Sequence, residues 1–141
     1  MTRFQPVLVV EDNPLDLDLI CRAFERCKLA NPIEVARDGE EALAFIPRWE
    51  AGETRPLVIL LDLKLSRLTG LEVLWALKAN PVSLAIPVVV LSTSLAREDV
   101  HEAYALGANS YLAKPVDFDR FLELAELIVQ YWVRTNRVVA D

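Results

Sequence analysis

Carboxylates directly follow two short apolar runs in this chain. Glu11 and Asp12 come after the run 7–10, and Asp62 comes after the run 57–61. Such runs predict buried strands, and parallel strands that end at one edge of a sheet would bring these acids together. Crowded negative charges are electrostatically costly unless a cation or a function compensates them. The acids therefore indicate a functional site at that edge.

A hydroxyl and an ammonium group stand at equivalent places later in the chain. Ser92 follows the apolar run 88–91, and Lys114 follows the run 110–112. Any one of these residues alone is more simply explained as a helix cap, a turn residue or a surface charge. All five together, each at the end of a predicted strand, favour a site.

The chemistry that suits this set is phosphoryl transfer. A carboxylate can attack phosphorus and form an acyl phosphate, a reaction that needs charge neutralisation more than acid–base help. Mg²⁺ fits because it takes oxygen ligands from one or two carboxylates, a phosphoryl group and water. We expect Asp12 and Asp62 to bind the ion directly and Glu11 to act through a water or as a weaker ligand. The backbone carbonyl of Lys64 would add a further ligand.

The other two groups would serve the transferred phosphoryl group. Lys114 would balance an extra phosphoryl oxygen, or Asp62 itself before reaction, and the Ser92 hydroxyl would hydrogen-bond the group after transfer. An aspartyl phosphatase is a weaker interpretation, because its second acid acts as general acid and Lys64 stands at that position. A flavin-binding protein is weaker still, because the first acid pair would repel the flavin phosphate. The pattern predicts a magnesium-dependent phosphoryl acceptor.

Short apolar runs alternate with helical patterns along the whole chain. The predicted strands span 7–10, 33–36, 57–61, 88–91 and 110–112, and the predicted helices span 14–27, 39–46, 70–78, 96–106 and 118–135. Pro47 is expected to end the second helix, and 49–56 reads as an exposed polar connection. The alternation predicts an α/β, (βα)5 doubly wound parallel sheet with helices on both faces. In such sheets the site forms at the carboxyl ends of the strands.

The composition narrows the class of protein. A chain of 141 residues with 53% hydrophobic and 26% charged residues is long and apolar enough for one globular domain. The net charge of −6, with no Lys/Arg block, argues against direct nucleic-acid binding. The absence of a long apolar run argues against a membrane segment or signal peptide and favours the cytoplasm. Cys21 and Cys27 lie outside any C-x-x-C motif, so a zinc or redox site is not expected.

Several stretches carry a family resemblance. They are Val-Val-Glu-Asp-Asn at 9–13, Asp-Gly-Glu-Glu-Ala-Leu at 38–43, Leu-Asp-Leu-Lys-Leu at 61–65 with Gly70, Pro-Val-Val-Val-Leu-Ser at 87–92, and Gly-Ala-Asn-Ser-Tyr-Leu-Ala-Lys-Pro at 107–115. Through them the chain resembles the receiver domain of two-component response regulators, the group that includes CheY. The resemblance covers about residues 6–134 and implies a CheY-like (flavodoxin-like) fold with strand order 2-1-3-4-5. It also implies that 1–141 form a single receiver domain with no effector domain after it.

The resemblance assigns roles to individual residues. It implies that Asp62 is the phosphoacceptor, that Ser92 and Tyr111 are switch residues, and that the Lys114–Pro115 peptide is cis. It implies that the protein is not an enzyme, apart from catalysing its own phosphorylation and dephosphorylation. The chain departs from the family pattern in having Ser66 where proline is common, which is expected to loosen that loop.

The resemblance also bears on partners. The sequence 11–16, the longer connection 49–56 and the extended ending resemble the stand-alone regulators paired with cyanobacterial and bacterial phytochromes. This implies a sensor histidine kinase of phytochrome type as phosphodonor. The output would pass through the face formed by the predicted helix 96–106, strand 110–112 and helix 118–135. The alternative is a phosphorylation-independent adaptor or dimeric scaffold that binds partners through the last helix.

The last predicted helix has more apolar surface than a core face needs. Beyond the stripe that should pack on the sheet, Leu124, Leu127 and Tyr131 widen its apolar arc. They predict a homodimer interface on this helix. The alternative is that the connection 49–56 or the tail 137–141 covers them.

Overall fold

Five parallel strands form one sheet at the centre of the molecule. A computed structural model describes residues 4–139 and shows the strand order β2-β1-β3-β4-β5, which confirms the predicted order. The strands are β1 (Val7–Val10), β2 (Ile33–Ala36), β3 (Val58–Asp62), β4 (Val88–Ser92) and β5 (Ser110–Ala113). Three of them differ from the predicted bounds by a residue at one or both ends. β3 and β4 extend to Asp62 and Ser92 because Asp62 still pairs with Leu91 and Ser92 still pairs with Ala113 in the ladder.

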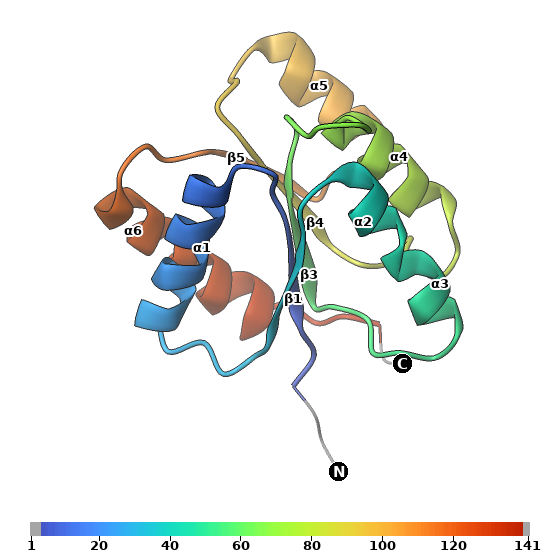
Figure 1. Cartoon of the computed structure of the whole chain (residues 1–141), viewed down its shortest axis with the longest axis horizontal. Coiled ribbons are helices and arrows are strands. Elements are labelled where there is room, and N and C mark those ends of the chain that lie inside the picture. The colour runs from blue at the N-terminus through green and yellow to red at the C-terminus, as the bar shows by residue number, and fades with distance from the viewer. Residues whose placement is uncertain (1–3, 140–141) are drawn as a thin grey trace.

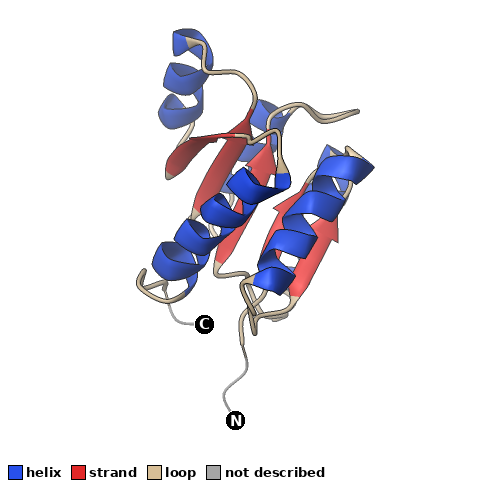
Figure 2. Cartoon of the chain, turned by 90° about the vertical axis from the view of Figure 1, so that its left-hand side faces the viewer, coloured by secondary structure: helices blue, strands red, loops and turns tan. Residues whose placement is uncertain are grey.

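Helices cover both faces of the sheet. They are α1 (Pro14–Arg26), α2 (Gly39–Leu43), α3 (Phe45–Glu50), α4 (Gly70–Ala79), α5 (Arg97–Ala105), α6 (Phe118–Ile128) and the π-helix η1 (Val129–Val133). Figure 1 shows α1 and α6 on one side of the sheet and α2 to α5 on the other. Figure 2 shows the strands running behind two helices that lie side by side. These helices are α1 and α6, which contact each other along the sheet. The predicted doubly wound (βα)5 architecture is confirmed.

The strand sequences explain why both faces are covered. In β1, Val7 and Val9 pack with α1 and α6, whereas Leu8 and Val10 pack with the helices of the other face. The side chains of a strand alternate between faces, so a strand that is apolar at every position needs cover on both sides. β1, β3 and β4 are buried along their full length, while the edge strands β2 and β5 are only partly buried.

The prediction that Pro47 ends the second helix is wrong. A break after Leu43 separates α2 from α3, and α3 carries Pro47 inside its first turn. The first N–H groups of a helix have no intrahelical acceptor, so proline removes nothing there. Trp49 belongs to α3 and is buried, so the exposed connection begins only after Glu50.

The last helix also departs from the prediction, which was one α-helix over 118–135. It is α-helical only to Ile128 and continues as η1, where the Arg134 N–H donates to the Val129 carbonyl at 3.0 Å. Trp132 packs half-buried against the core beside α1 and α6. A hydrophobic stripe indicates a helix, but it does not distinguish i+4 from i+5 bonding.

Candidate functional site

The three predicted acids meet at the carboxyl end of the sheet. Glu11, Asp12 and Asp62 each offer a carboxylate oxygen, and these oxygens lie within 4.8 Å of one another. Glu11 is 1% exposed and Asp62 is 6% exposed, whereas Asp12 is half-buried. The arrangement arises because β1 and β3 are parallel neighbours in the ladder and both end at this edge.

The start of α1 orients Glu11. Asn13 caps the helix, its side chain accepting from the N–H groups of Leu15 and Asp16. The Asn13 N–H donates to Glu11 Oε2 at 3.2 Å. Because Asn13 both caps the helix and donates its backbone N–H to Glu11, the turn that begins α1 also orients Glu11.

Gly70 lets α4 begin directly against the end of β3. A Cβ at this position would lie 2.4 Å from the Leu63 Cα and 2.5 Å from the Asp62 carbonyl oxygen. Both contacts are with backbone, so any side chain would push the helix away from the strand that carries Asp62. The Gly70 N–H instead donates to the Leu63 carbonyl at 3.0 Å. Glycine at position 70 therefore allows α4 to pack directly against the end of β3 that carries Asp62.

Lys114 reaches into the acids from the end of β5. Its Nζ lies 2.7 Å from Glu11 Oε1, 2.7 Å from Asp16 Oδ2 and 3.2 Å from Asp62 Oδ2. The sequence argument placed Lys114 here but missed Asp16. The only signal for Asp16 is its position in the first turn of α1, which follows directly from the acid pair.

The expected cis peptide between Lys114 and Pro115 is wrong: the bond is trans. The trans isomer is favoured by about 0.5–1 kcal/mol even before proline. The Lys114 side chain reaches its three carboxylates from the trans backbone, and its N–H donates to the Ser92 carbonyl at 2.8 Å.

Burial and crowding set the charges of the site. Burial raises the pKa of Glu11 to about 7, with Lys114 acting to lower the pKa and Asp62 to raise it further. Burial also acts to lower the pKa of Lys114, but its contacts with Asp16 and Glu11 outweigh this and leave the pKa above its ordinary value. Lys114 therefore remains a cation, and burial makes the negative charge of Glu11 costly.

The backbone of the loop after β3 donates hydrogen bonds to two of the acids. The Lys64 N–H donates to Asp62 Oδ1 at 3.2 Å, and the Ser66 N–H donates to Asp12 Oδ2 at 3.1 Å. Proline has no N–H, so a proline at position 66 could not make the second bond. The serine therefore adds a tether between this loop and Asp12, against the expectation that it loosens the loop.

Ser92 and Tyr111 belong to one connected set of bonds. Ser92 is buried, and its Oγ accepts from the Ser94 N–H at 3.0 Å. The Tyr111 hydroxyl donates to the Ser94 carbonyl at 2.7 Å. Ser94 Oγ in turn donates to Asp99 in the first turn of α5. The loop between β4 and α5 thus joins Ser92 to Tyr111 through a single residue.

The donor set fits a hard divalent cation. Three carboxylates converge, and Glu11 Oε1 is buried without a well-directed hydrogen bond although Lys114 Nζ lies near it. Oxygen ligands from acids are those that Mg²⁺ prefers. An ion held by Glu11, Asp12 and Asp62 would offset charge that one ammonium group leaves uncompensated.

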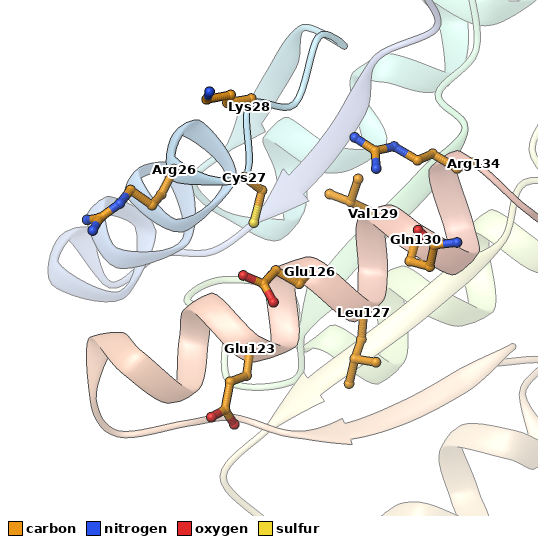
Figure 3. Close-up of a pocket in the computed structure, with 9 residues that line it drawn as sticks. All are labelled: Arg26, Cys27, Lys28, Glu123, Glu126, Leu127, Val129, Gln130 and Arg134. Carbon is orange, nitrogen blue, oxygen red and sulfur yellow. The ribbon is translucent and has the colours of Figure 1, made fainter.

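The predicted apolar residues of the last helix lie away from this site. Leu127 and Tyr131 are 67% and 50% exposed, whereas Leu124 is half-buried against the core beside α1. Leu127 lines a groove of about 690 Å³ between the end of α1 and the α6–η1 segment. Figure 3 shows charged side chains of both signs around this groove. They are Arg26, Lys28, Glu123, Glu126 and Arg134.

Neither the connection 49–56 nor the described part of the tail covers Leu127 and Tyr131, which are both exposed. Val138 and Val139 of the tail line a small pocket together with Pro56 and Ile86, and residues 140 and 141 lie outside the described part of the chain. Among residues 4–139 there is no helix long and apolar enough to span a bilayer.

Comparison with known proteins gives the family. The family model of the response regulator receiver domain matches residues 7–126. A probable methanogenesis regulatory protein FilR2 from Methanothrix harundinacea is 43% identical over 132 residues, covering 93% of this chain and 85% of the relative. The response regulator Rcp1 from Synechocystis sp. is 36% identical, covering 92% and 89%.

Solved structures agree with this assignment. The phosphorylated cyanobacterial phytochrome response regulator RcpA superimposes with a TM-score of 0.89 at 34% identity, over 98% of this chain and 100% of that one. The Mn²⁺-bound form of Rcp1 gives a TM-score of 0.86 at 34% identity, over 96% and 99%. Receiver domains are in general non-catalytic signalling proteins of two-component systems. The chain belongs to the response regulator receiver domain family, and it is similar to the regulators associated with phytochromes.

Proposed function

We propose that the protein is a stand-alone receiver that takes a phosphoryl group on Asp62 from the phosphohistidine of a sensor histidine kinase. The observation that carries this proposal is the convergence of three acids and one ammonium group at the end of the sheet. A phytochrome-type kinase is the donor we favour, because RcpA, to which the chain is similar, is a cyanobacterial phytochrome response regulator.

The reaction is one displacement at phosphorus. A carboxylate oxygen of Asp62 forms a bond to phosphorus while the bond from phosphorus to the imidazole nitrogen of the donor breaks. The products are an acyl phosphate and a histidine whose nitrogen takes up a proton. Asp62 keeps a small exposed fraction through which the donor can approach.

The other residues manage charge around that displacement. Glu11, Asp12, Asp62 and the Lys64 carbonyl would hold Mg²⁺, which supplies charge neutralisation for the transferred group. Lys114, already 3.2 Å from Asp62 Oδ2, would pair with a phosphoryl oxygen. The Ser92 hydroxyl would donate to another.

The signal would leave through α5, β5 and α6. Ser92 is joined to Tyr111 through Ser94, so a shift of Ser92 toward the phosphoryl group would disturb the bond between the Tyr111 hydroxyl and the Ser94 carbonyl. The phosphoryl group then needs only to favour one of two arrangements of the β4–α5 loop. The same loop carries the Ser94–Asp99 bond to α5.

Phosphorylation by a small donor tests the proposal. With Mg²⁺ and acetyl phosphate we expect the intact mass to increase by one phosphoryl group, and we expect no increase when EDTA is present. No increase in a protein shown to be folded by circular dichroism would contradict the proposal. It would favour a phosphorylation-independent adaptor that acts through α6.

A homodimer through α6 and η1 is the partner that the surface favours. Leu127 and Tyr131 are exposed apolar groups, and the groove beside Leu127 carries both basic and acidic side chains. In an interface with two-fold symmetry the acidic groups of each copy can meet basic groups of the other. Leu124 is half-buried and would contribute only its outer edge.

Light scattering at high concentration measures this association. We expect a dimer for the wild type and a monomer for Leu127→Glu, since the substitution places charge in the apolar part of the interface. Leu84→Glu is the matched control, because Leu84 is 55% exposed and lies outside α6 and η1. A monomeric wild type in both phosphorylation states would rule the dimer out.

A further inference from the structure

Asp16 holds the Lys114 ammonium group although it lies outside the acid cluster. Its Oδ2 is 2.7 Å from Lys114 Nζ, as close as Glu11 Oε1 and closer than Asp62 Oδ2. The Asp16 side chain is 30% exposed, whereas those of Glu11 and Asp62 are buried. The three carboxylates surround an ammonium group that has three N–H bonds to give.

These three partners of Lys114 differ in what else they can bind. Glu11 and Asp62 belong to the acid cluster that a divalent cation would bind, so a cation would draw part of their charge away from Lys114. Asp16 is not part of that cluster, and its backbone N–H is fixed by the Asn13 cap in the first turn of α1. Its contact with Lys114 would therefore persist when the cation binds.

We propose that Asp16 is a positioning residue that restrains Lys114 and competes with the phosphoryl group for its ammonium charge. This inference rests on the proposed function. The Asp16 carboxylate forms an ion pair with the Lys114 ammonium group at 2.7 Å and places a negative charge near the path of the anionic donor. It thereby slows phosphorylation of Asp62 relative to a site in which Lys114 faces only Glu11 and Asp62.

Removing the charge tests the competition. We expect Asp16→Asn to raise the second-order rate constant for phosphorylation by acetyl phosphate by about three- to tenfold, since a unit charge several ångströms away is only partly screened. Asp16→Glu keeps the charge and is expected to return the rate to within about twofold of the wild type. The measurement is intact mass against time at fixed Mg²⁺ concentration.

Asp18→Asn is the matched control. Asp18 lies two residues further along α1, and its carboxylate pairs only at 3.5 Å with the exposed Arg22. The Asp18→Asn substitution removes the same charge from the same helix but at a distance from Lys114, so we expect the wild-type rate of phosphorylation. Equal effects of Asp16→Asn and Asp18→Asn would overturn the inference, and so would a slower reaction in Asp16→Asn.

The charge of the donor separates competition from a structural effect. Phosphoramidate carries less negative charge than acetyl phosphate at neutral pH, so the gain in Asp16→Asn should be smaller with phosphoramidate. A general loosening of α1 would change both rates by the same factor, and that result would also overturn the inference. If the wild type gains no phosphoryl group at all, the proposed function fails. If it gains one but Asp16→Asn behaves as wild type, only the role of Asp16 fails.

Discussion

Asp62→Asn is expected to abolish phosphorylation. The amide of asparagine is a poor nucleophile and cannot form a stable acyl phosphate, so we expect the rate to fall by more than about a hundredfold. Asparagine has nearly the shape of aspartate, and removing one of the crowded negative charges relieves repulsion with the buried Glu11. The variant should therefore be folded and at least as stable as the wild type without metal.

Intact mass after incubation with acetyl phosphate and Mg²⁺ measures this loss. Asp18→Asn serves as the control, since Asp18 is an exposed acid of α1 outside the pocket, and it should gain a phosphoryl group as the wild type does. Asp12→Asn keeps the nucleophile but removes a metal ligand, so its phosphorylation should be slow and recover partly at high Mg²⁺. A full mass gain in Asp62→Asn would show that the phosphoacceptor lies elsewhere.

Lys114→Met should have the largest effect on stability. It leaves Glu11, Asp16 and Asp62 facing one another without the ammonium group that lies between them. Breaking a buried ion pair by removing one partner costs about 3–5 kcal/mol, and the exposed fraction of Asp16 places this site toward the lower value. We expect about 3 kcal/mol less free energy of unfolding near pH 8 without metal.

The loss of unfolding free energy in Lys114→Met should increase as the pH rises. The pKa of Glu11 is about 7 in the folded chain against an ordinary 4.5, so the folded state binds more protons than the unfolded state between these values. A raised acid pKa means that stability falls as pH rises through this window. Lys114 acts to lower that pKa, so its removal should extend the window upward and make the loss smaller near pH 5.5 than near pH 8.

Urea unfolding with EDTA at the two pH values checks this expectation. Lys64→Met is the matched control, because it removes the same charge from an exposed residue beside the pocket and should change stability by less than about 0.5 kcal/mol. Mg²⁺ should recover part of the loss in Lys114→Met near pH 8. A loss that is equal at both pH values, or equal to that of Lys64→Met, would contradict the proposed balance of charge.

The sequence was informative where one physical demand dominates. Strands such as 58–61 are apolar at every position, and a strand of this kind is stable only with helices on both faces. That demand, with alternating helical patterns, determined the layers of the fold. It also placed Glu11, Asp12, Asp62 and Lys114 at one edge, because parallel strands end together.

The sequence failed where two local structures have similar free energies. Pro47 disfavours a helix interior but is tolerated in a first turn, and only the break after Leu43 decided which applies. The helix switches to π-helical bonding at Val129, and the hydrophobic stripe that includes Trp132 is compatible with either form. The bond before Pro115 is trans, and the two isomers of such a bond differ by only about 0.5–1 kcal/mol.

Residue types and order along the chain by themselves determined which groups meet at the site, because every acid, hydroxyl and ammonium group of the set stands at or just after the end of a strand. Only the tertiary structure decided how they share charge. Asp16 is distant from Lys114 in sequence, yet its Oδ2 lies 2.7 Å from Lys114 Nζ, because α1 begins and β5 ends at the same carboxyl edge of the sheet. Distances of this kind arise from packing between elements, and no spacing within one element encodes them.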